Sequence, residues 1–332
     1  MESCLIVTYR CNAKCYMCNT WQHPSKKTEE YSPTLVEKIP DGLKFINITG
    51  GEPFLRDDLE DIINIAVKKS KRVVISSNGY FTKKMIKMAE TFGNKVGFRI
   101  SIEGLPAAND ELRGLKNGFD HGIRTLVALH SMGIKDIGFG MTVSDRNAKD
   151  MLELYHLANA MELEFATATT HNSFYFHKED NNYIDPDMIA GEFEKIAVAL
   201  LKTNKPKNWF RAYFNMGLAN KVKGGKRPLD CEVGTDVFFM DPYGSILPCN
   251  GSERPMIMGN LNTQSFEDIW RGKKAISVRE QVKTCNKECW MIGSASPAMK
   301  KNISTPLTWV LKNKLRVLKK CNTNIRLDSI KR

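Results

Sequence analysis

The sequence predicts an α/β fold: a partial barrel of six strand–helix units, followed by a small α+β domain and a basic amphipathic tail. Three observations support this prediction. Short apolar segments typical of buried strands alternate with amphipathic segments typical of helices. Cysteines gather in one group near each end of the chain. Residues 298–332 hold ten Lys or Arg and one Asp, which is +9 of the net charge of +12.

The six units follow one another through short connections. A strand that returns to a parallel neighbour needs a crossover, so the helices are expected to cover the sheet. Six units suit a partial barrel better than a closed barrel of eight. The strands are expected at 5–9, 43–48, 73–76, 96–102, 136–143 and 163–169, and the helices from near 33 and at 57–69, 82–91, 118–132, 148–160 and 187–203.

The pattern changes after residue 205. Residues 206–230 are rich in Lys and Gly and are predicted to form a linker. Apolar residues flank a turn sequence within 235–249, which predicts a hairpin, and short helices are expected over 265–281. We therefore divide the chain into a barrel at 1–205, a linker at 206–230, a small domain at 231–297 and a tail at 298–332.

Composition excludes several classes of protein. With 42% hydrophobic and 26% charged residues, the 332-residue chain is expected to fold. It has no run of 18 apolar residues and no secretory leader, so we expect it to remain in the cytoplasm. Its nine cysteines are an odd number without an export signal, which disfavours a disulfide framework and favours metal binding.

Cys11, Cys15 and Cys18 form the first group, with the spacing C-x3-C-x2-C. Three thiolates on one loop can hold three irons of a [4Fe–4S] cube and leave the fourth iron open to a cofactor. The alternative is a zinc loop with His23 as the fourth ligand.

The context of this loop resembles the radical S-adenosylmethionine (SAM) superfamily. The loop follows the first predicted strand, and Gly50-Gly51-Glu52-Pro53 follows the second. The resemblance covers about residues 5–170 and implies that the three cysteines ligate a catalytic cluster whose open iron binds SAM. It also implies reductive cleavage to a 5′-deoxyadenosyl radical, which abstracts hydrogen from a substrate carbon, and an external one-electron donor of flavodoxin or ferredoxin type.

The same resemblance implies further SAM contacts. Glycines let the backbone approach closely and a carboxylate suits an ammonium, which fits binding of the methionyl amino group. A serine and an arginine grip the cofactor carboxylate in sulfatase-maturing relatives. Ser76 and Asn78 are the implied ribose contacts, and the alternative for both is that they cap a helix. The implied contacts are Gly50, Gly51 and Glu52 to the amino group, Ser101 and Arg113 to the carboxylate, Ser76 and Asn78 to the ribose, and Val143 to the adenine.

The second cysteine group resembles the SPASM/twitch auxiliary-cluster domains that follow radical SAM cores. Four thiolates would ligate all four irons of a second [4Fe–4S] cluster and leave no iron open to substrate. This favours a redox relay or a structural role over substrate binding. The alternative is a four-cysteine zinc ribbon. The predicted ligands are Cys231, Cys249, Cys285 and Cys289.

Residues 306–320 are predicted to form an amphipathic helix. It fits an interfacial helix on an anionic membrane, which would make the protein peripheral at the cytoplasmic face. The equal alternative is a helix docked on the body, and nucleic acid is disfavoured because phosphate binding does not need an apolar stripe. At roughly 100° per residue, the apolar face holds Leu307, Val310, Leu311, Leu315, Val317 and Leu318, the basic face holds Lys312, Arg316, Lys319 and Lys320, and Lys314 interrupts the apolar face.

Polar residues that follow the sixth and fourth strands are the candidate substrate contacts. They are expected to face the cavity at the carboxyl ends of the strands. The alternative is a packed, aromatic-rich loop. The candidates are His171, Asn172, Tyr175, His177 and Glu103.

Together these features predict a radical SAM oxidoreductase that oxidises a carbinol of a sugar, a cyclitol or a lipid-linked glycan, and the auxiliary cluster would accept the second electron. This resembles the radical SAM aminocyclitol dehydrogenases. One alternative is a sugar epimerase. Epimerisation needs a hydrogen-atom donor, and this chain offers no obvious one, because Cys4 is expected to be packed and Cys321 lies in the tail. Another alternative is a peptide maturase. It is disfavoured here because only ten residues precede Cys11, which leaves no room for an N-terminal module that binds a leader peptide. The contrasting class is a zinc-ribbon adaptor that binds membranes or RNA.

Overall fold

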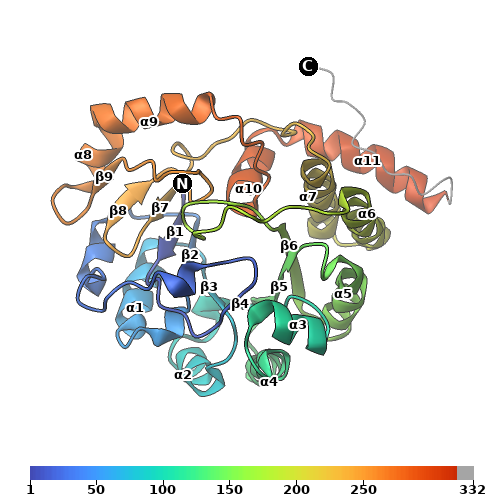
Figure 1. The fold of residues 1–332 in the computed structure, drawn as a ribbon, viewed down its shortest axis with the longest axis horizontal. Coiled ribbons are helices and arrows are strands. Elements are labelled where there is room, and N and C mark those ends of the chain that lie inside the picture. Colours follow the sequence, from blue (N-terminus) through green and yellow to red (C-terminus); the bar gives the residue numbers. More distant parts are fainter. Residues whose placement is uncertain (320–332) are drawn as a thin grey trace.

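The computed structural model describes residues 1–319. Within them the strands form one sheet in the order β6-β5-β4-β3-β2-β1-β7-β8-β9, and β1 to β6 pair in parallel. The six-stranded α/β prediction is confirmed, and Figure 1 shows these strands as an open, curved row. The bounds are β1 (Glu2–Ile6), β2 (Phe45–Thr49), β3 (Val73–Ser77), β4 (Val96–Ser101), β5 (Ile137–Val143) and β6 (Glu164–Thr169).

The first strand ends three residues earlier than predicted. Val7, Thr8 and Tyr9 are buried like strand residues, but they already lead into the cysteine loop. The crossover to β2 contains a 3-10 helix, η2 (Pro33–Lys38), in place of a full α-helix. The predicted strands and helices are otherwise present within a few residues, and α3 (Pro106–Arg113) was not predicted.

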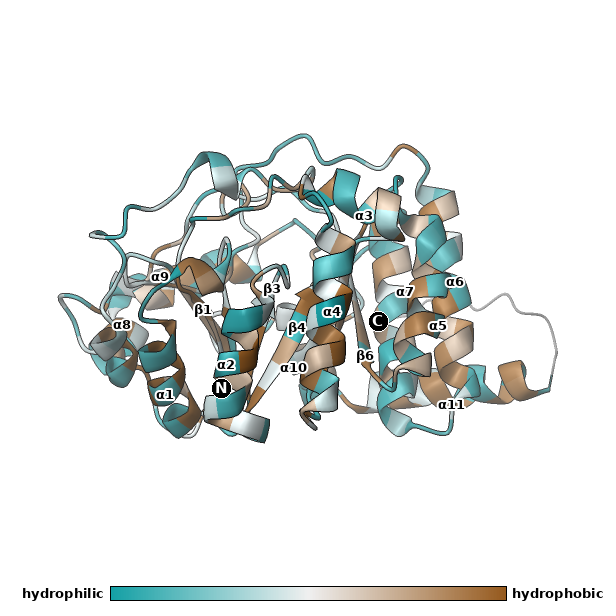
Figure 2. Cartoon of the chain, turned by 90° about the horizontal axis from the view of Figure 1, so that it is seen from below, coloured by the Kyte–Doolittle hydropathy of each residue, from teal (hydrophilic) through white to brown (hydrophobic). Residues whose placement is uncertain are grey.

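Amphipathic helices cover the outer face of the barrel strands (Figure 1). Each places apolar residues in the main core and polar residues outward, so hydrophilic and hydrophobic residues alternate around the ribbons in Figure 2. These helices are α1 (Leu59–Lys69), α2 (Thr82–Phe92), α4 (Gly118–Ser131) and α5 (Met151–Ala160), with the short turns η3 (Pro53–Leu55), η4 (Gly93–Lys95) and η5 (Ala148–Asp150) between elements.

The prediction of a linker over 206–230 is wrong for its first 17 residues, which form helix α7 (Pro206–Val222). This helix packs along α6 (Pro186–Lys202). Tyr213 is completely buried, and Gly217 lies against Trp290, where a Cβ would come within 2.1 Å of the indole nitrogen. The Lys- and Gly-rich composition belongs mainly to residues 223–226, which follow the helix, and not to its buried face.

The C-terminal region continues the same sheet. β7 (Val237–Met240) pairs in parallel with β1 and forms the predicted hairpin with β8 (Ser245–Leu247), which pairs with β9 (Gly259–Asn260). Gly244, with φ of 80°, adopts the left-handed conformation that the hairpin turn needs. The predicted short helices are α8 (Phe266–Arg271) and α9 (Lys273–Lys283), which lie together at the upper left of Figure 1.

Two helices, α10 (Ile292–Lys301) and α11 (Ser304–Leu318), complete the described chain. Helix α11 packs on α6 and α7, so the helix is docked on the body, and contact of its outer face with a membrane stays a prediction. The single predicted apolar face is divided, because Val310 is buried against the body whereas Leu311 is 56% exposed. Lys320 and Cys321 lie outside the described residues. Within residues 1–319, no helix has both the length and the apolar character needed to cross a bilayer.

Candidate active site

The three N-terminal cysteines lie on one loop, between β1 and the short helix η1 (Thr20–Gln22), where the carboxyl ends of the strands meet. Cys11, Cys15 and Cys18 are free and partly buried. Burial raises the pKa of the Cys11 thiol to about 12 and that of Cys15 to about 11. The charge of Cys15 also raises the pKa of Cys11, and that of Cys18 raises the pKa of Cys15, so the fold brings the three together. Thiolates in such surroundings need a compensating cation.

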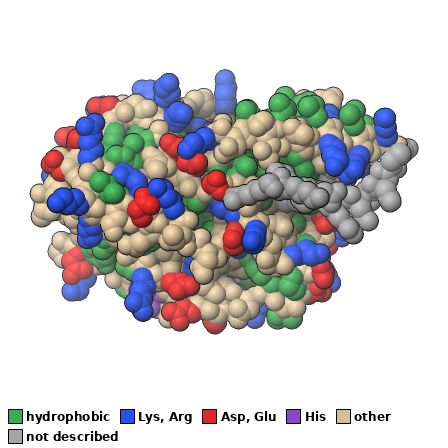
Figure 3. All heavy atoms as spheres, turned by 90° about the horizontal axis from the view of Figure 1, so that it is seen from above, with side chains coloured by type: hydrophobic (Ala, Val, Ile, Leu, Met, Phe, Trp, Pro, Cys, Tyr) green, Lys and Arg blue, Asp and Glu red, His purple; other side chains and the backbone are tan. Residues whose placement is uncertain are grey.

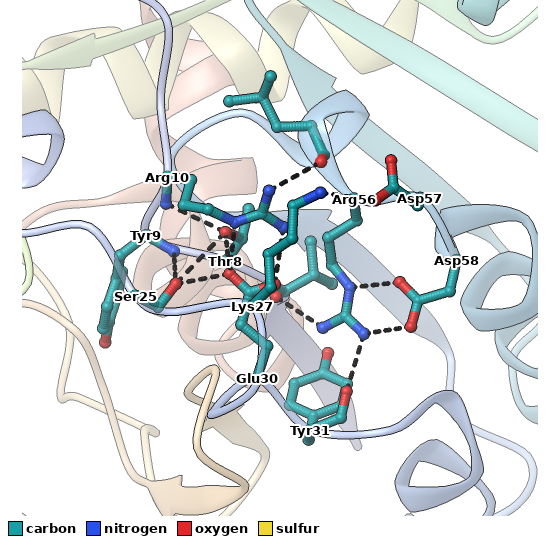
Figure 4. Close-up of polar contacts among 12 residues, drawn as sticks. Thr8, Tyr9, Arg10, Ser25, Lys27, Glu30, Tyr31, Arg56, Asp57 and Asp58 are labelled. Atoms are coloured by element: carbon teal, nitrogen blue, oxygen red, sulfur yellow. Dashed lines mark hydrogen bonds and ion pairs between the residues drawn. The ribbon is translucent and has the colours of Figure 1, made fainter.

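A polar network fixes the two ends of this loop (Figure 4). The Glu30 carboxylate accepts hydrogen bonds from Arg10 Nε at 2.9 Å, from Arg10 Nη2 at 2.8 Å, from Ser25 Oγ at 2.6 Å and from Thr8 Oγ1. Arg10 Nη1 also donates to the Leu55 carbonyl at 3.0 Å. Although burial opposes it, these hydrogen bonds lower the pKa of Glu30, so the carboxylate stays charged. The network joins the residue before the first cysteine to the segment after the third.

A second arginine ties the neighbouring segments together (Figure 4). Arg56 donates to the Val7 carbonyl at 2.9 Å and to the Tyr31 carbonyl at 2.8 Å, and it pairs with Asp58. Arg56 thus links the segment after β2 to the end of β1.

The glycine motif lies directly against the start of the cysteine loop. A Cβ on Gly50 would come within 2.3 Å of the Thr8 carbonyl oxygen, and one on Gly51 within 2.3 Å of the Arg10 carbonyl oxygen. Gly50 also has φ of 155°. Both positions therefore require glycine because two backbone segments touch there, a reason that the sequence did not reveal.

Glu52 is completely buried beside this motif. Its carboxylate accepts hydrogen bonds from Ser77 Oγ at 2.9 Å, from the Asn78 amide at 2.8 Å and from the Phe54 amide at 3.1 Å. Burial raises the pKa of Glu52. A further donor such as an ammonium would complete the carboxylate's interactions, which fits the predicted role.

The two predicted ribose contacts lie at the end of β3. Asn78 donates to the Asn12 side chain in the cysteine loop at 2.8 Å, whereas Ser76 donates to Asn47 at 2.9 Å. The alternative that they cap α2 is wrong, because the N-cap residue of α2 is Phe81. Only Asn78 of this pair contacts the cysteine loop directly.

Arg113 ends α3 and is buried behind the cysteine loop. Its backbone carbonyl accepts a hydrogen bond from the Lys14 amide at 3.0 Å. Its Nη1 donates to Glu103 at 2.9 Å, but its Nε has no hydrogen-bond partner within the described residues. Although burial opposes it, the charges of Cys15, Glu103 and Cys11 raise the pKa of Arg113. A buried guanidinium with an unused donor suits a cofactor carboxylate.

The other residues of this edge occupy strand ends. Ser101 ends β4 opposite Gly140, and Val143 ends β5 and is fully buried. Glu103, predicted as a substrate contact, accepts from Arg113 and from the Thr142 amide at 2.5 Å. In this arrangement Glu103 positions Arg113.

The segment 171–177 bridges the two cysteine groups. On one side Tyr175 donates from its hydroxyl to the Gly50 carbonyl at 2.8 Å, and its own carbonyl accepts from Thr20 at 3.0 Å. On the other side Lys287 donates to the carbonyl of Asn172 at 2.8 Å. Tyr175 is buried, so its contacts are those of a positioning residue. His177 stacks on His23 with ring centroids 4.1 Å apart.

Polar groups without partners gather between the two cysteine groups. His171 Nδ1, Asn181 Oδ1 and Asn250 Oδ1 are buried and have no hydrogen-bond partner within the described residues. Burial, with Lys221 and Lys287 nearby, lowers the pKa of His171 to about 3, so its ring is neutral. Unused buried polar atoms indicate a ligand or ordered water.

Sequence reasoning missed three residues of this region. Asn181 donates to the carbonyl of Met17 in the cysteine loop at 3.1 Å. Lys221 donates to Thr169 at 2.9 Å, and Lys287 donates to the Gly251 carbonyl at 3.0 Å. The position of Lys287 between two cysteines was the one available signal, whereas Lys221 was hidden in the predicted linker.

The four C-terminal cysteines are more open. Cys231 and Cys285 are exposed, and Cys249 and Cys289 are partly buried. Burial raises the pKa of Cys249 and Cys289, the charge of Cys231 adds to the rise at Cys249, and the charges of Cys249 and Cys285 add to the rise at Cys289. Arg227 anchors this loop, because its guanidinium donates to the Cys289 carbonyl and to the Ser294 carbonyl.

No group of three or more His, Cys, Asp or Glu side chains within residues 1–319 is arranged to hold a metal ion. A [4Fe–4S] cluster asks for a different arrangement, with one sulfur at each of several separate irons. The residues present fit that requirement in kind: three thiols share a buried loop, and Arg113 offers an unused donor.

Comparisons with known proteins match two parts of the chain to known families. A family model described as the radical SAM superfamily matches residues 5–158, and SPASM, described as an iron-sulfur cluster-binding domain, matches residues 231–291. The antilisterial bacteriocin subtilosin biosynthesis protein AlbA of Bacillus subtilis is 24% identical over 276 residues, which cover 80% of this chain and 58% of AlbA. The AdoMet-dependent heme synthase of Methanosarcina barkeri is 24% identical over 290 residues, covering 80% of each chain.

Among solved structures, the fold matches native anSMEcpe with bound AdoMet and Kp18Cys peptide, with a TM-score of 0.62 and 15% identity, over 96% of this chain and 99% of that one. The two family matches thus define a radical SAM core followed by an iron–sulfur cluster-binding domain. The chain belongs to the radical SAM superfamily and carries a C-terminal SPASM domain. Its cofactors are SAM and two [4Fe–4S] clusters.

Proposed function

We propose that this enzyme modifies a peptide by removing hydrogen from one of its carbons. The observation that carries the proposal is the alignment with AlbA, a bacteriocin biosynthesis protein, through both domains and over 80% of this chain. The anSMEcpe structure with a similar fold holds a peptide. AlbA is the longer protein, since this chain spans 58% of it, so its activity enters here only as support.

A porphyrin substrate is less consistent with the site, although heme synthases are also relatives. Porphyrin faces require apolar contacts, whereas His171, Asn181 and Asn250 bring unused polar atoms to the space between the two cysteine groups. Amide groups of a peptide would satisfy such atoms. His171 and Asn181 are therefore our proposed substrate contacts, with Tyr175, Glu103 and Asn172, whose side chain is paired with the Asn181 backbone, as positioning residues.

Each proposed cofactor residue has a defined task. Cys11, Cys15 and Cys18 would hold the catalytic cluster, and Cys231, Cys249, Cys285 and Cys289 the auxiliary one. When bound, the cluster and SAM supply the radical that abstracts hydrogen. Glu52 would orient the methionyl amino group and Arg113 the carboxylate. Asn78 and Ser76 would bind the ribose, Ser101 would assist Arg113, and Val143 would pack against the adenine.

The test measures the transfer of deuterium from a labelled substrate to 5′-deoxyadenosine. Anaerobically reconstituted enzyme, SAM and a reductant are incubated with synthetic peptides deuterated at carbon, and separately with deuterated sugars and cyclitols. Deuterium in 5′-deoxyadenosine from the peptides, together with a mass loss of the peptide, is expected. Transfer from sugars or cyclitols alone would reject the peptide proposal and leave the enzyme class intact.

Oxidation of a carbinol of a sugar, cyclitol or lipid-linked glycan is the second candidate. Four cysteines in the C-terminal group favour one closed auxiliary cluster, which suits an acceptor for the second electron. The unused polar atoms could also accept hydrogen bonds from the hydroxyl groups of such a substrate. The relatives support peptides at least as well, so the preference reached from sequence is placed second. A cytoplasmic location stays a prediction.

A further inference from the structure

The outer face of α11 carries an apolar stripe unrelated to the radical chemistry. Successive members are three or four residues apart, so they share one side of the helix. All are large side chains, and each is at least 42% exposed. The stripe consists of Ile303 (56% exposed), Leu307 (42%), Leu311 (56%), Leu315 (59%) and Leu318 (59%).

Other residues of α11, beside and behind the stripe, fix the orientation of the helix. Trp309, Val310 and Asn313 are buried. Lys314 donates to the carbonyls of Leu201 at 2.9 Å and Thr203 at 3.0 Å, and so satisfies the end of α6. Because these contacts hold α11 on the body, the stripe cannot turn inward and is displayed on a rigid surface.

A basic row runs along one edge of the stripe. Lys312, Arg316 and Lys319 are exposed. At about 100° per residue they lie roughly 80–140° around the helix from Leu311. Helix α11 contains no acidic residue between Ser304 and Leu318. Figure 3 shows hydrophobic and basic side chains next to one another at the end of the molecule that α11 occupies.

We propose that α11 docks this enzyme on an anionic lipid bilayer. The stripe would enter the boundary between headgroups and acyl chains, and Lys312, Arg316 and Lys319 would lie among the lipid phosphates. Charge selects this occupant, because a second copy packed through the same face would bring two basic rows together. A bilayer supplies both an apolar layer and the opposite charge in one plane.

The test uses sedimentation of the full chain with vesicles of phosphatidylcholine alone or with phosphatidylglycerol. The wild type should bind the anionic vesicles. Leu311→Glu with Leu315→Glu, and Lys312→Glu with Arg316→Glu, should each weaken binding by on the order of tenfold or more. SAM cleavage should be unchanged in both, because α11 is outside the active site.

Helix α9 offers matched controls. Ile276 is 53% exposed, so Ile276→Glu tests exposure of an apolar side chain alone. Lys273 and Lys274 are exposed, so Lys273→Glu with Lys274→Glu changes the net charge equally. These variants should retain vesicle binding. Equal binding to neutral vesicles, equal loss in the α9 controls, or a wild-type dimer that the stripe variant makes monomeric without any vesicle binding would each overturn the proposal.

Discussion

The two cysteine groups differ in how far the protein prepares them. The N-terminal group lies on a partly buried loop whose ends are joined by the hydrogen bonds of Glu30 and Arg10. In the C-terminal group Cys231 and Cys285 are exposed, although Arg227 at Cys289 and Lys287 at the Asn172 and Gly251 carbonyls hold part of the loop. The fold therefore shapes the first site before a cluster binds, whereas the second depends more on the cluster for its order.

The largest effect is expected at the first group. Cys15→Ala should abolish SAM cleavage to 5′-deoxyadenosine, because the catalytic cluster loses one of three ligands. The matched control is Cys4→Ala, which removes a partly buried thiol of β1 that no proposed cluster uses. Persistent cleavage in Cys15→Ala would discredit the first site.

A different outcome is expected at the second group. Cys285→Ala should lower bound iron by about four per chain and remove substrate turnover, whereas SAM cleavage should stay within several-fold of the wild type. Iron analysis and 5′-deoxyadenosine assays separate the two readouts. If cleavage disappears as completely as in Cys15→Ala, the two sites are not independent and the comparison fails.

The sequence predicted the parts that depend on local pattern. Cysteine spacing, strand periodicity and the turn at Asp241–Gly244 are all encoded within short segments. Helix α7 was missed because its buried face is defined by a distant partner: Trp290 fills the space beside Gly217 and donates to the Phe214 carbonyl at 2.9 Å. Composition alone could not show that contact.

The site shows the same limit. The cysteines and the glycine motif could be found from spacing, but Lys221, Lys287 and Asn181 meet only after α7 and the SPASM domain pack beside the barrel. The roles of Tyr175 and Glu103 also changed, because the sequence could not show that Gly50 and Arg113 are their partners.

The loop anchor predicts a moderate effect on stability. Glu30→Gln removes the negative charge of the carboxylate that accepts hydrogen bonds from Arg10, so the free energy of unfolding should fall by about 1.5–3 kcal/mol. Chemical denaturation of the cluster-free chain measures the fall. The control is Glu29→Gln, whose side chain is 47% exposed and pairs with Lys26, and whose loss should cost under about 1 kcal/mol. Equal losses in both variants would show that the loop does not depend on this network.

The smallest effect concerns an ion cluster remote from both cysteine groups. Asp136 accepts from Arg72 at 2.7 Å and from Arg99 at 2.6 Å, and its side chain is 29% exposed. Although burial opposes it, these arginines lower the pKa of Asp136 from 3.8 to about 2. A lowered folded-state pKa means that the stabilisation is complete well above the unfolded value and is lost as the pH falls toward the folded value.

Asp136→Asn should therefore lower the free energy of unfolding at pH 7 by about 2 kcal/mol at most, and the difference from wild type should shrink to about half near pH 3. Urea unfolding of the cluster-free chain at several pH values measures this trend. Asp41, 83% exposed and paired with Lys69, provides the control, since Asp41→Asn should have little effect at any pH. A pH-independent difference for Asp136→Asn would mean that packing, and not charge, carries the contribution of Asp136 to stability. A change of pH could then not alter the stability of this remote cluster separately from that of the two cysteine sites.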